Sequence, residues 1–121
     1  MSRLLIVDDE EILTDSLQDI LEGEGHRVLT AHNGMAALDT LAREQLDLVL
    51  LDLMLPLVDG LTVLETLRRD TPSTAVLVVT SCASEALQGQ LVQGFLRKPF
   101  SLTALLRAVE AVLPPVPPTP E

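Results

Sequence analysis

The chain has 121 residues, a length that favours one folded domain with a single hydrophobic core. Its 18 acidic residues against 8 basic ones give a formal charge of −10, which argues against direct nucleic-acid binding because such binding requires positive charge to neutralise phosphates. The single cysteine excludes an intramolecular disulfide, and no apolar run is long enough for a signal peptide or a membrane span, so we expect a cytoplasmic protein without membrane contact.

Five short apolar runs alternate with stretches of helical periodicity along the chain. The runs cover residues 4–7, 27–30, 48–51, 75–79 and, more weakly, 94–96. The first, third and fourth runs are almost continuously apolar, which is typical of parallel strands covered on both faces. The alternation therefore predicts an α/β fold with a doubly wound, five-stranded parallel sheet and helices on both faces.

The stretches between the runs differ in how strongly they predict helices. Apolar residues recur at helical spacing at 13–21, 37–41, 61–67 and 102–113, with Asn33 and Gly34 at the start of the second stretch and Ser101 as a plausible N-cap of the last. Residues 84–92 are only weakly amphipathic, so we expect a short, mobile fourth helix there. Five prolines within 114–120 predict an extended tail or the start of a linker, which gives a domain at 1–113 and a Pro-rich segment at 114–121.

Polar residues follow four of the five predicted strands. Asp8 and Asp9 follow the first strand, Asp52 follows the third, Thr80 and Ser81 follow the fourth, and Lys98 follows the fifth. The carboxyl ends of parallel strands lie at one edge of the sheet, where ligands bind in such folds, so we expect these residues to converge. Capping of the next helix explains Asp8 or Asp9 equally well, but it does not explain Asp52, which has apolar residues on both sides.

The expected cluster of three carboxylates requires a positive partner. Carboxylates about 4 Å apart repel by roughly 4 kcal/mol per pair at an effective dielectric near 20. Oxygen ligands with room for water suit Mg²⁺, which we predict as the bound cation. Lys98 is the only lysine beside seven arginines, which favours a compact ammonium for pairing with a carboxylate or phosphate.

Four fragments together resemble the receiver domains of bacterial response regulators. They are residues 6–10, residues 52–56 with Asp59 and Gly60 shortly after, residues 78–81 and residues 96–100. The resemblance covers about residues 3–113 and implies a flavodoxin-like strand order 2-1-3-4-5 in a (βα)5 fold with a shortened fourth helix. It also implies a protein that accepts a phosphoryl group from a sensor histidine kinase or a phosphotransfer protein and controls an output.

The resemblance assigns a role to each residue of the predicted cluster. Asp52 is expected to accept the phosphoryl group from a phosphohistidine, in a Mg²⁺-dependent reaction. The expected metal ligands are Asp9, Asp52 and the backbone carbonyl of Met54, with Asp8 holding a metal-bound water. The remaining roles are phosphoryl contacts for Lys98, Thr80 and Ser81, and a switch that combines Thr80 with Phe95.

Two departures from the family pattern affect the output and the lifetime of the phosphorylated state. The stretch from Thr80 to Lys98 is about one helical turn shorter than in the family, so the partner or homodimer contacts of this face are in doubt. Ser81 replaces a smaller residue, and Met54 and Cys82 are apolar or nearly so where polar residues assist hydrolysis, which predicts slow autodephosphorylation. Apart from its own phosphotransfer and dephosphorylation, the protein is not expected to be an enzyme.

Two other classes of function stay open from the sequence. A haloacid-dehalogenase-type phosphohydrolase also uses a strand-end aspartate with Mg²⁺, but it expects an acid at the position of Met54. A pseudo-receiver would bind partners without phosphorylation, and the unusual fourth helix favours it while the complete acceptor site opposes it.

Overall fold

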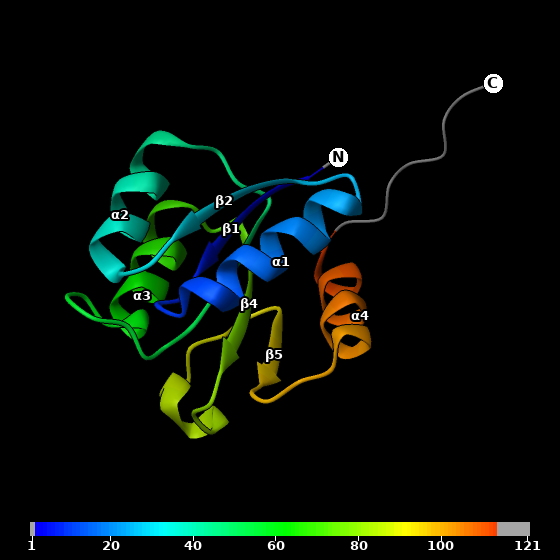
Figure 1. The fold of residues 1–121 in the computed structure, drawn as a ribbon. Helices are drawn as coiled ribbons and strands as arrows, with labels where there is room; N and C mark the ends of the chain where they lie inside the picture. The colour runs from blue at the N-terminus through cyan, green and yellow to red at the C-terminus, as the bar shows by residue number, and fades with distance from the viewer. Residues whose placement is uncertain (1, 114–121) are drawn as a thin grey trace.

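A computed structural model describes residues 2–113, so the predicted Pro-rich segment 114–121 lies outside the described residues. Five parallel strands form one sheet in the order β2-β1-β3-β4-β5, which confirms the predicted architecture (Figure 1). The strands are β1 (Arg3–Val7), β2 (Arg27–Ala31), β3 (Leu48–Leu51), β4 (Ala75–Thr80) and β5 (Gly94–Arg97). Each begins or ends within one residue of its predicted run.

Four α-helices cover the two faces of the sheet, as the right-handed crossovers of a parallel sheet require (Figure 1). On one face lie α1 (Glu11–Gly23) and α4 (Leu102–Val112), which bury Leu17, Leu21, Leu105 and Val109. On the other lie α2 (Gly34–Arg43) and α3 (Gly60–Asp70). None of the described helices is long and apolar enough to cross a membrane.

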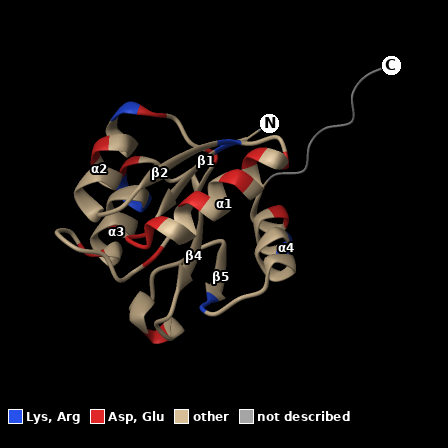
Figure 2. Cartoon of the chain, viewed as in Figure 1, with Lys and Arg blue, Asp and Glu red and all other residues tan. Residues whose placement is uncertain are grey.

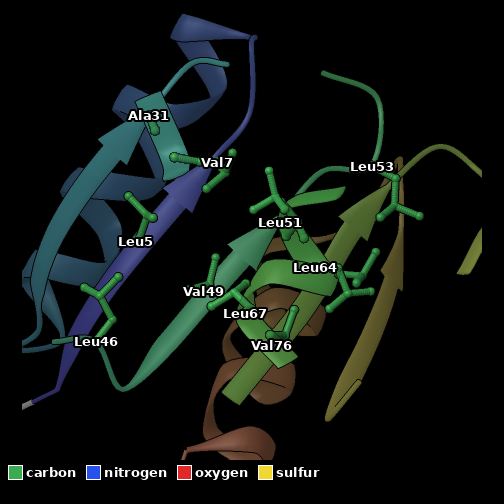
Figure 3. Packing of buried hydrophobic residues seen from close by; sticks show 13 residues of the cluster. Leu5, Val7, Ala31, Leu46, Val49, Leu51, Leu53, Leu64, Leu67 and Val76 are labelled. Atoms are coloured by element: carbon green, nitrogen blue, oxygen red, sulfur yellow. The ribbon is translucent and has the colours of Figure 1, made fainter. Parts of the chain in front are cut away.

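The strands at the centre of the sheet are apolar because both of their faces are covered. Every residue of β3 and β4 is buried, and so are four of the five residues of β1. Leu5, Val49 and Val76 are paired across β1, β3 and β4 and lie on the face covered by α2 and α3, in one buried cluster with Leu64 and Leu67 of α3 (Figure 3). Each such side chain contributes about 1.5–3 kcal/mol on burial, so this core fixes the register of the strands whose ends form the site.

Side-chain caps start three of the helices just beyond the strand ends. Asn33 accepts a hydrogen bond from the amide of Ala36 at 2.7 Å, and Asp59 accepts one from the amide of Thr62 at 2.8 Å. Ser101 accepts from the amide of Ala104 at 3.1 Å, which confirms its predicted capping role. Caps of this kind contribute about 1 kcal/mol each and determine where the chain turns back over the sheet.

The fourth connection is shorter and less regular than predicted. Instead of a helix over residues 84–92, the chain forms a single 3-10 turn, η1 (Ser84–Leu87). Gln88 has a φ of 50° and Gly89 a φ of 82°, and two successive residues of positive φ end the turn. The shortened helix is thus confirmed, but its predicted extent was wrong.

Gln93 returns the chain from this connection to the sheet. Its amide donates to the carbonyl oxygen of Val76 at 3.1 Å, and its side-chain oxygen accepts from the amide of Val76 at 2.8 Å. Arg68 of α3 donates to the same side-chain oxygen and to the carbonyl oxygen of Thr74, both at 3.1 Å. These contacts hold the start of β5 beside β4, although no α-helix lies between these two strands in the chain.

Candidate functional site

The strand register brings the predicted polar residues together at the carboxyl edge of the sheet. Val7 pairs with Leu51, and the amide of Asp52 donates to the carbonyl oxygen of Val7 at 2.9 Å. The amide of Lys98 donates to the carbonyl oxygen of Thr80 at 2.8 Å, which fixes the end of β5 beside that of β4. The predicted convergence of residues from four strands is therefore confirmed.

Three aspartates form a compact cluster at this edge. One carboxylate oxygen from each of Asp8, Asp9 and Asp52 lies within 4.8 Å of the other two. Asp8 is 3% exposed and Asp52 is 5% exposed, whereas Asp9 is open to solvent. Burial raises the pKa of Asp8, although its hydrogen bond from Lys98 acts in the opposite direction. An all-oxygen cluster that is buried on one side and open on the other fits a hydrated divalent cation such as Mg²⁺.

Lys98 supplies the positive charge that the buried carboxylates require. Its Nζ atom lies 2.7 Å from Asp8, 3.0 Å from Glu10 and 3.0 Å from Asp52. Burial disfavours the ammonium, but the hydrogen bonds to the three carboxylates outweigh it and raise the pKa of Lys98. The side chain therefore stays charged at neutral pH. The following peptide bond, Lys98–Pro99, is cis.

Both oxygens of the Asp52 carboxylate are held by donors. Oδ1 accepts from the hydroxyl of Thr80 at 2.8 Å and from the amide of Met54 at 3.0 Å, and Oδ2 accepts from Lys98. Thr80 is fully buried, so its hydroxyl reaches Asp52 without competition from bulk water. These contacts fix the orientation of the carboxylate before any ligand arrives.

The cluster opens into a cavity of about 960 Å³. Its lining combines charged or polar side chains with apolar ones, among them Met54, Leu55, Pro56 and Phe100. Ser81 is exposed on the lining, and its hydroxyl lies 3.9 Å from the Met54 sulfur. Exposed acids continue along α1, where Figure 2 shows them in red, so the surroundings attract cations and repel polyanions.

Most of the predicted site residues are in this cluster, with one exception. Asp8, Asp9, Asp52, Thr80 and Lys98 converge, and Ser81 and Met54 line the cavity. Phe95 does not line it, because its half-buried ring packs against the core on the α2 and α3 face. For Met54 the contact with Asp52 runs through the backbone amide, and the predicted role of its carbonyl stays a prediction.

The sequence did not single out two residues that shape the site. Glu10 pairs with Lys98, and only its place after the two aspartates hinted at this. Gly60, the first residue of α3, lies so close to β3 that a Cβ atom there would overlap the carbonyl oxygen of Asp52 and the Cα of Leu53. Its position in a family fragment was the signal, but the close approach itself is a tertiary contact.

Comparisons with known proteins agree with this geometry. The chain matches the family model of the response regulator receiver domain over residues 4–110. It is 39% identical to the transcriptional regulatory protein CpxR of Escherichia coli in an alignment of 117 positions that covers 93% of this chain and 50% of that protein. It is 37% identical to the response regulator MprA of Mycobacterium avium in an alignment of 115 positions that covers 92% of this chain and 50% of that protein. The chain thus spans about half the length of these curated relatives.

Solved structures give the same picture. The non-phosphorylated HemR receiver domain of Leptospira biflexa superposes with a TM-score of 0.87 and 31% identity, covering 98% of this chain and 99% of that one. The response regulator TrrA of Thermotoga maritima, solved in complex with Mg²⁺-BeF, has a TM-score of 0.86 and 30% identity, covering 93% of this chain and 100% of that one. The strand order, the edge cluster and these likenesses agree, and the chain belongs to the response regulator receiver domain family.

Proposed function

We propose that Asp52 accepts a phosphoryl group from a phosphohistidine of a sensor histidine kinase or phosphotransfer protein, in a Mg²⁺-dependent reaction. The observation that carries this proposal is the position of the Asp52 carboxylate, which lies between Lys98 and the carboxylates of Asp8 and Asp9 at the edge of an open cavity. In the transfer, one Asp52 oxygen forms a bond to phosphorus while the phosphorus–nitrogen bond of the donor breaks. The donor imidazole keeps the electron pair of that bond.

The cation would be held by Asp9, Asp52 and the carbonyl oxygen of Met54, with Asp8 binding through a water molecule. When bound, it would neutralise negative charge on the transferring phosphoryl oxygens. Lys98 orients Asp52 before transfer and then pairs with the phosphoryl group. Thr80 and Ser81 lie beside Asp52 as hydroxyl donors for the phosphoryl oxygens.

The switch would couple Thr80 to Phe95. Thr80 already donates to Asp52, so phosphorylation requires this hydroxyl to exchange one acceptor oxygen for another. Phe95 lies on β5, the strand that pairs with β4, and packs against the same core cluster as Leu87 and Val92 of the fourth connection. A small shift of Thr80 would thereby change the surface around η1 and β5.

In this proposal the chain acts as a signalling domain rather than as an enzyme with a separate substrate. Residues 1–113 would form the receiver and residues 114–121 the start of a linker to an output domain, since the curated relatives are about twice as long as the chain. The acidic surface opposes nucleic-acid binding by the receiver itself, so DNA contact would be left to an output domain. The change in this surface would alter homodimerisation or the docking of the receiver on the output domain.

The competing hypotheses are less well supported. A phosphohydrolase of the haloacid-dehalogenase type needs a general acid two residues after the nucleophile, and the Met54 thioether cannot supply a proton. A pseudo-receiver has no need for a partly buried ammonium that is paired with the acceptor carboxylate.

Acetyl phosphate with Mg²⁺, followed by intact mass measurement, tests the proposal. The parent protein should gain one phosphoryl group. Chelation of Mg²⁺ before the donor is added should prevent this gain. Asp52→Asn should gain none, whereas Asp59→Asn, which changes an exposed carboxylate nearby and keeps an N-cap, should behave like the parent. Equal labelling of Asp52→Asn, or no labelling of the parent, would contradict the proposal, and turnover of a generic phosphate ester would favour the hydrolase.

A further inference from the structure

Met54 places a sulfur atom at the mouth of the acceptor site. The residue is 61% exposed, and its side chain lines the cavity together with Asp52 and Lys98. Its amide donates to Oδ1 of Asp52 at 3.0 Å, so the backbone holds the residue directly beside the acceptor. A small oxidant dissolved in water can therefore reach the thioether at a point where any change in polarity acts on Asp52.

Ser81 contacts this sulfur from the neighbouring strand end. Its hydroxyl donates toward Sδ of Met54 at 3.9 Å, between the loops that follow β3 and β4. A thioether is a weak hydrogen-bond acceptor, so in the reduced protein this contact contributes little. A sulfoxide oxygen is a much stronger acceptor, and the same hydroxyl would then hold it over the acceptor site.

We propose that Met54 is an oxidation site through which peroxide shortens the lifetime of phosphorylated Asp52. In the reaction, Sδ takes one oxygen atom from hydrogen peroxide, the peroxide O–O bond breaks and water leaves. Sulfur loses two electrons, and the peroxide gains them. A methionine sulfoxide reductase with a thiol reductant restores the thioether, so the modification is reversible. The inference rests on the proposed phosphoacceptor function of Asp52.

The expected effect follows from the polarity of the cavity wall. Around Met54 the cavity lining includes the apolar side chains of Leu55, Pro56 and Phe100, and the reduced Met54 side chain itself offers no strong acceptor that would orient an attacking water molecule. A sulfoxide oxygen held by Ser81 adds such an acceptor next to Asp52. A water molecule that donates to it is positioned to attack phosphorus, and the bond between phosphorus and the Asp52 oxygen then breaks.

The chain contains a matched control for this site. Met35, on α2, is 60% exposed, almost the same as Met54, but it does not line the cavity. Peroxide will oxidise both residues, so only their positions distinguish the two. Met54→Leu removes the proposed site, and Met35→Leu removes the control site.

The experiment compares the phosphoryl lifetime of each protein before and after peroxide treatment. The peroxide is quenched, and a dithiol then reduces any sulfenic acid or disulfide at Cys82 without reducing sulfoxide. Peptide mapping measures the sulfoxide at each methionine and any higher oxidation of Cys82. Acetyl phosphate and Mg²⁺ then load Asp52, the donor is removed, and intact mass follows the loss of the phosphoryl group.

We expect peroxide to shorten the lifetime several-fold in the parent and in Met35→Leu, and to leave it unchanged in Met54→Leu. Ser81→Ala, whose sulfoxide lacks its hydroxyl partner, should show a smaller shortening than the parent.

The outcomes separate this inference from the proposed function. Three results would overturn the inference while phosphorylation of Asp52 stands. They are the absence of sulfoxide at Met54, an unchanged or longer phosphoryl lifetime in the oxidised parent, and equal shortening of that lifetime in Met54→Leu. Equal shortening in Ser81→Ala would overturn the role of the Ser81 hydroxyl. Failure of the untreated parent to accept a phosphoryl group would refute the proposed function, and this inference with it.

Discussion

The hydroxyl of Thr80 donates a 2.8 Å hydrogen bond to Oδ1 of Asp52 across the gap between β4 and β3, and both side chains are buried. The amide of Cys82 in turn donates to the Thr80 hydroxyl at 3.4 Å. Thr80 therefore acts as donor and acceptor at once within the protein. The acceptor carboxylate is held by the fold itself, which reduces the reorganisation needed when a phosphoryl donor arrives.

Replacing Thr80 with Val should destabilise the protein by about 1–2 kcal/mol, because a buried carboxylate oxygen and a backbone amide each lose a partner while the shape is kept. Urea unfolding followed by circular dichroism measures the change in the free energy of unfolding. Thr80→Ser keeps the hydroxyl and should lose less of the stability. Equal stability of Thr80→Val and the parent would show that the hydrogen bond does not contribute.

The sequence predicted the sheet well because β1, β3 and β4 are covered on both faces, and such strands have a simple apolar pattern. The same logic located Asp8, Asp52 and Lys98, since in a parallel sheet the residue after a strand lies at a known edge. These predictions needed only local patterns and one topological rule.

Other features depend on contacts between distant residues and could not be predicted in this way. The pairing of Glu10 with Lys98 is set by where the two loops meet. The fourth connection has a weak helical pattern, and its 3-10 turn results from the left-handed residues Gln88 and Gly89 and from the hold of Gln93 on β4. The contact of Thr80 with Asp52 depends on a side-chain rotamer, which periodicity does not determine.

Removing the charge of Lys98 should strengthen Mg²⁺ binding. Lys98 and a bound cation would share the carboxylates of Asp8 and Asp52, and two unit charges about 4 Å apart repel by roughly 4 kcal/mol at an effective dielectric near 20. We expect Lys98→Met to bind Mg²⁺ at least about tenfold more tightly, which corresponds to about 1.4 kcal/mol. Isothermal titration calorimetry suits the measurement, because the chain has no Trp or Tyr to report binding by fluorescence.

The control for this prediction is Arg107→Met, which makes the same change in net charge on the exposed side of α4. It should change the affinity for Mg²⁺ far less than Lys98→Met does. Weaker binding by Lys98→Met than by the parent would mean that the lysine organises the carboxylates for the cation rather than competing with it.

The stability of the protein should fall at alkaline pH as Lys98 loses its proton. Hydrogen bonds to the carboxylates raise the pKa of Lys98 above its ordinary value of 10.5, so the folded state keeps a proton that the unfolded state releases. The stabilisation is complete below pH 10.5 and is lost as the pH rises further, with a slope of up to about 1.4 kcal/mol per pH unit. No other lysine and no tyrosine titrates in this range.

Urea unfolding at several pH values measures how the free energy of unfolding changes with pH. The titration of Lys98 sets the window at roughly pH 9.5 to 11.5. The free energy of unfolding of Lys98→Met should be nearly flat across the window in which the parent declines. Parallel slopes in the two proteins would mean that the ion pairs of Lys98 are not the cause.

Gly60→Ala should be strongly destabilising, by about 2–4 kcal/mol, because its Cβ would overlap the backbone of Asp52 and Leu53 and force α3 away from β3. Gly23→Ala is the matched control, since nothing lies within 4 Å of a Cβ at this helix position. The control should be neutral or stabilised by up to about 1 kcal/mol. Thermal unfolding of both variants measures the difference, and equal melting temperatures would contradict the close approach of α3 to the acceptor strand.

The amides of residues 84–92 should exchange with deuterium much faster than those of α4. The connection contains one 3-10 turn, and its backbone bonds are few, from Ala86 to Ala83, from Gln88 to Glu85 and from Gln90 to Leu87. Leu91 is 83% exposed, so little apolar burial opposes local opening. In α4, by contrast, Leu105 and Val109 are buried against the sheet. Exchange in the connection as slow as in α4 would show a rigid output face, and slower exchange on phosphorylation would show that Asp52 controls its order.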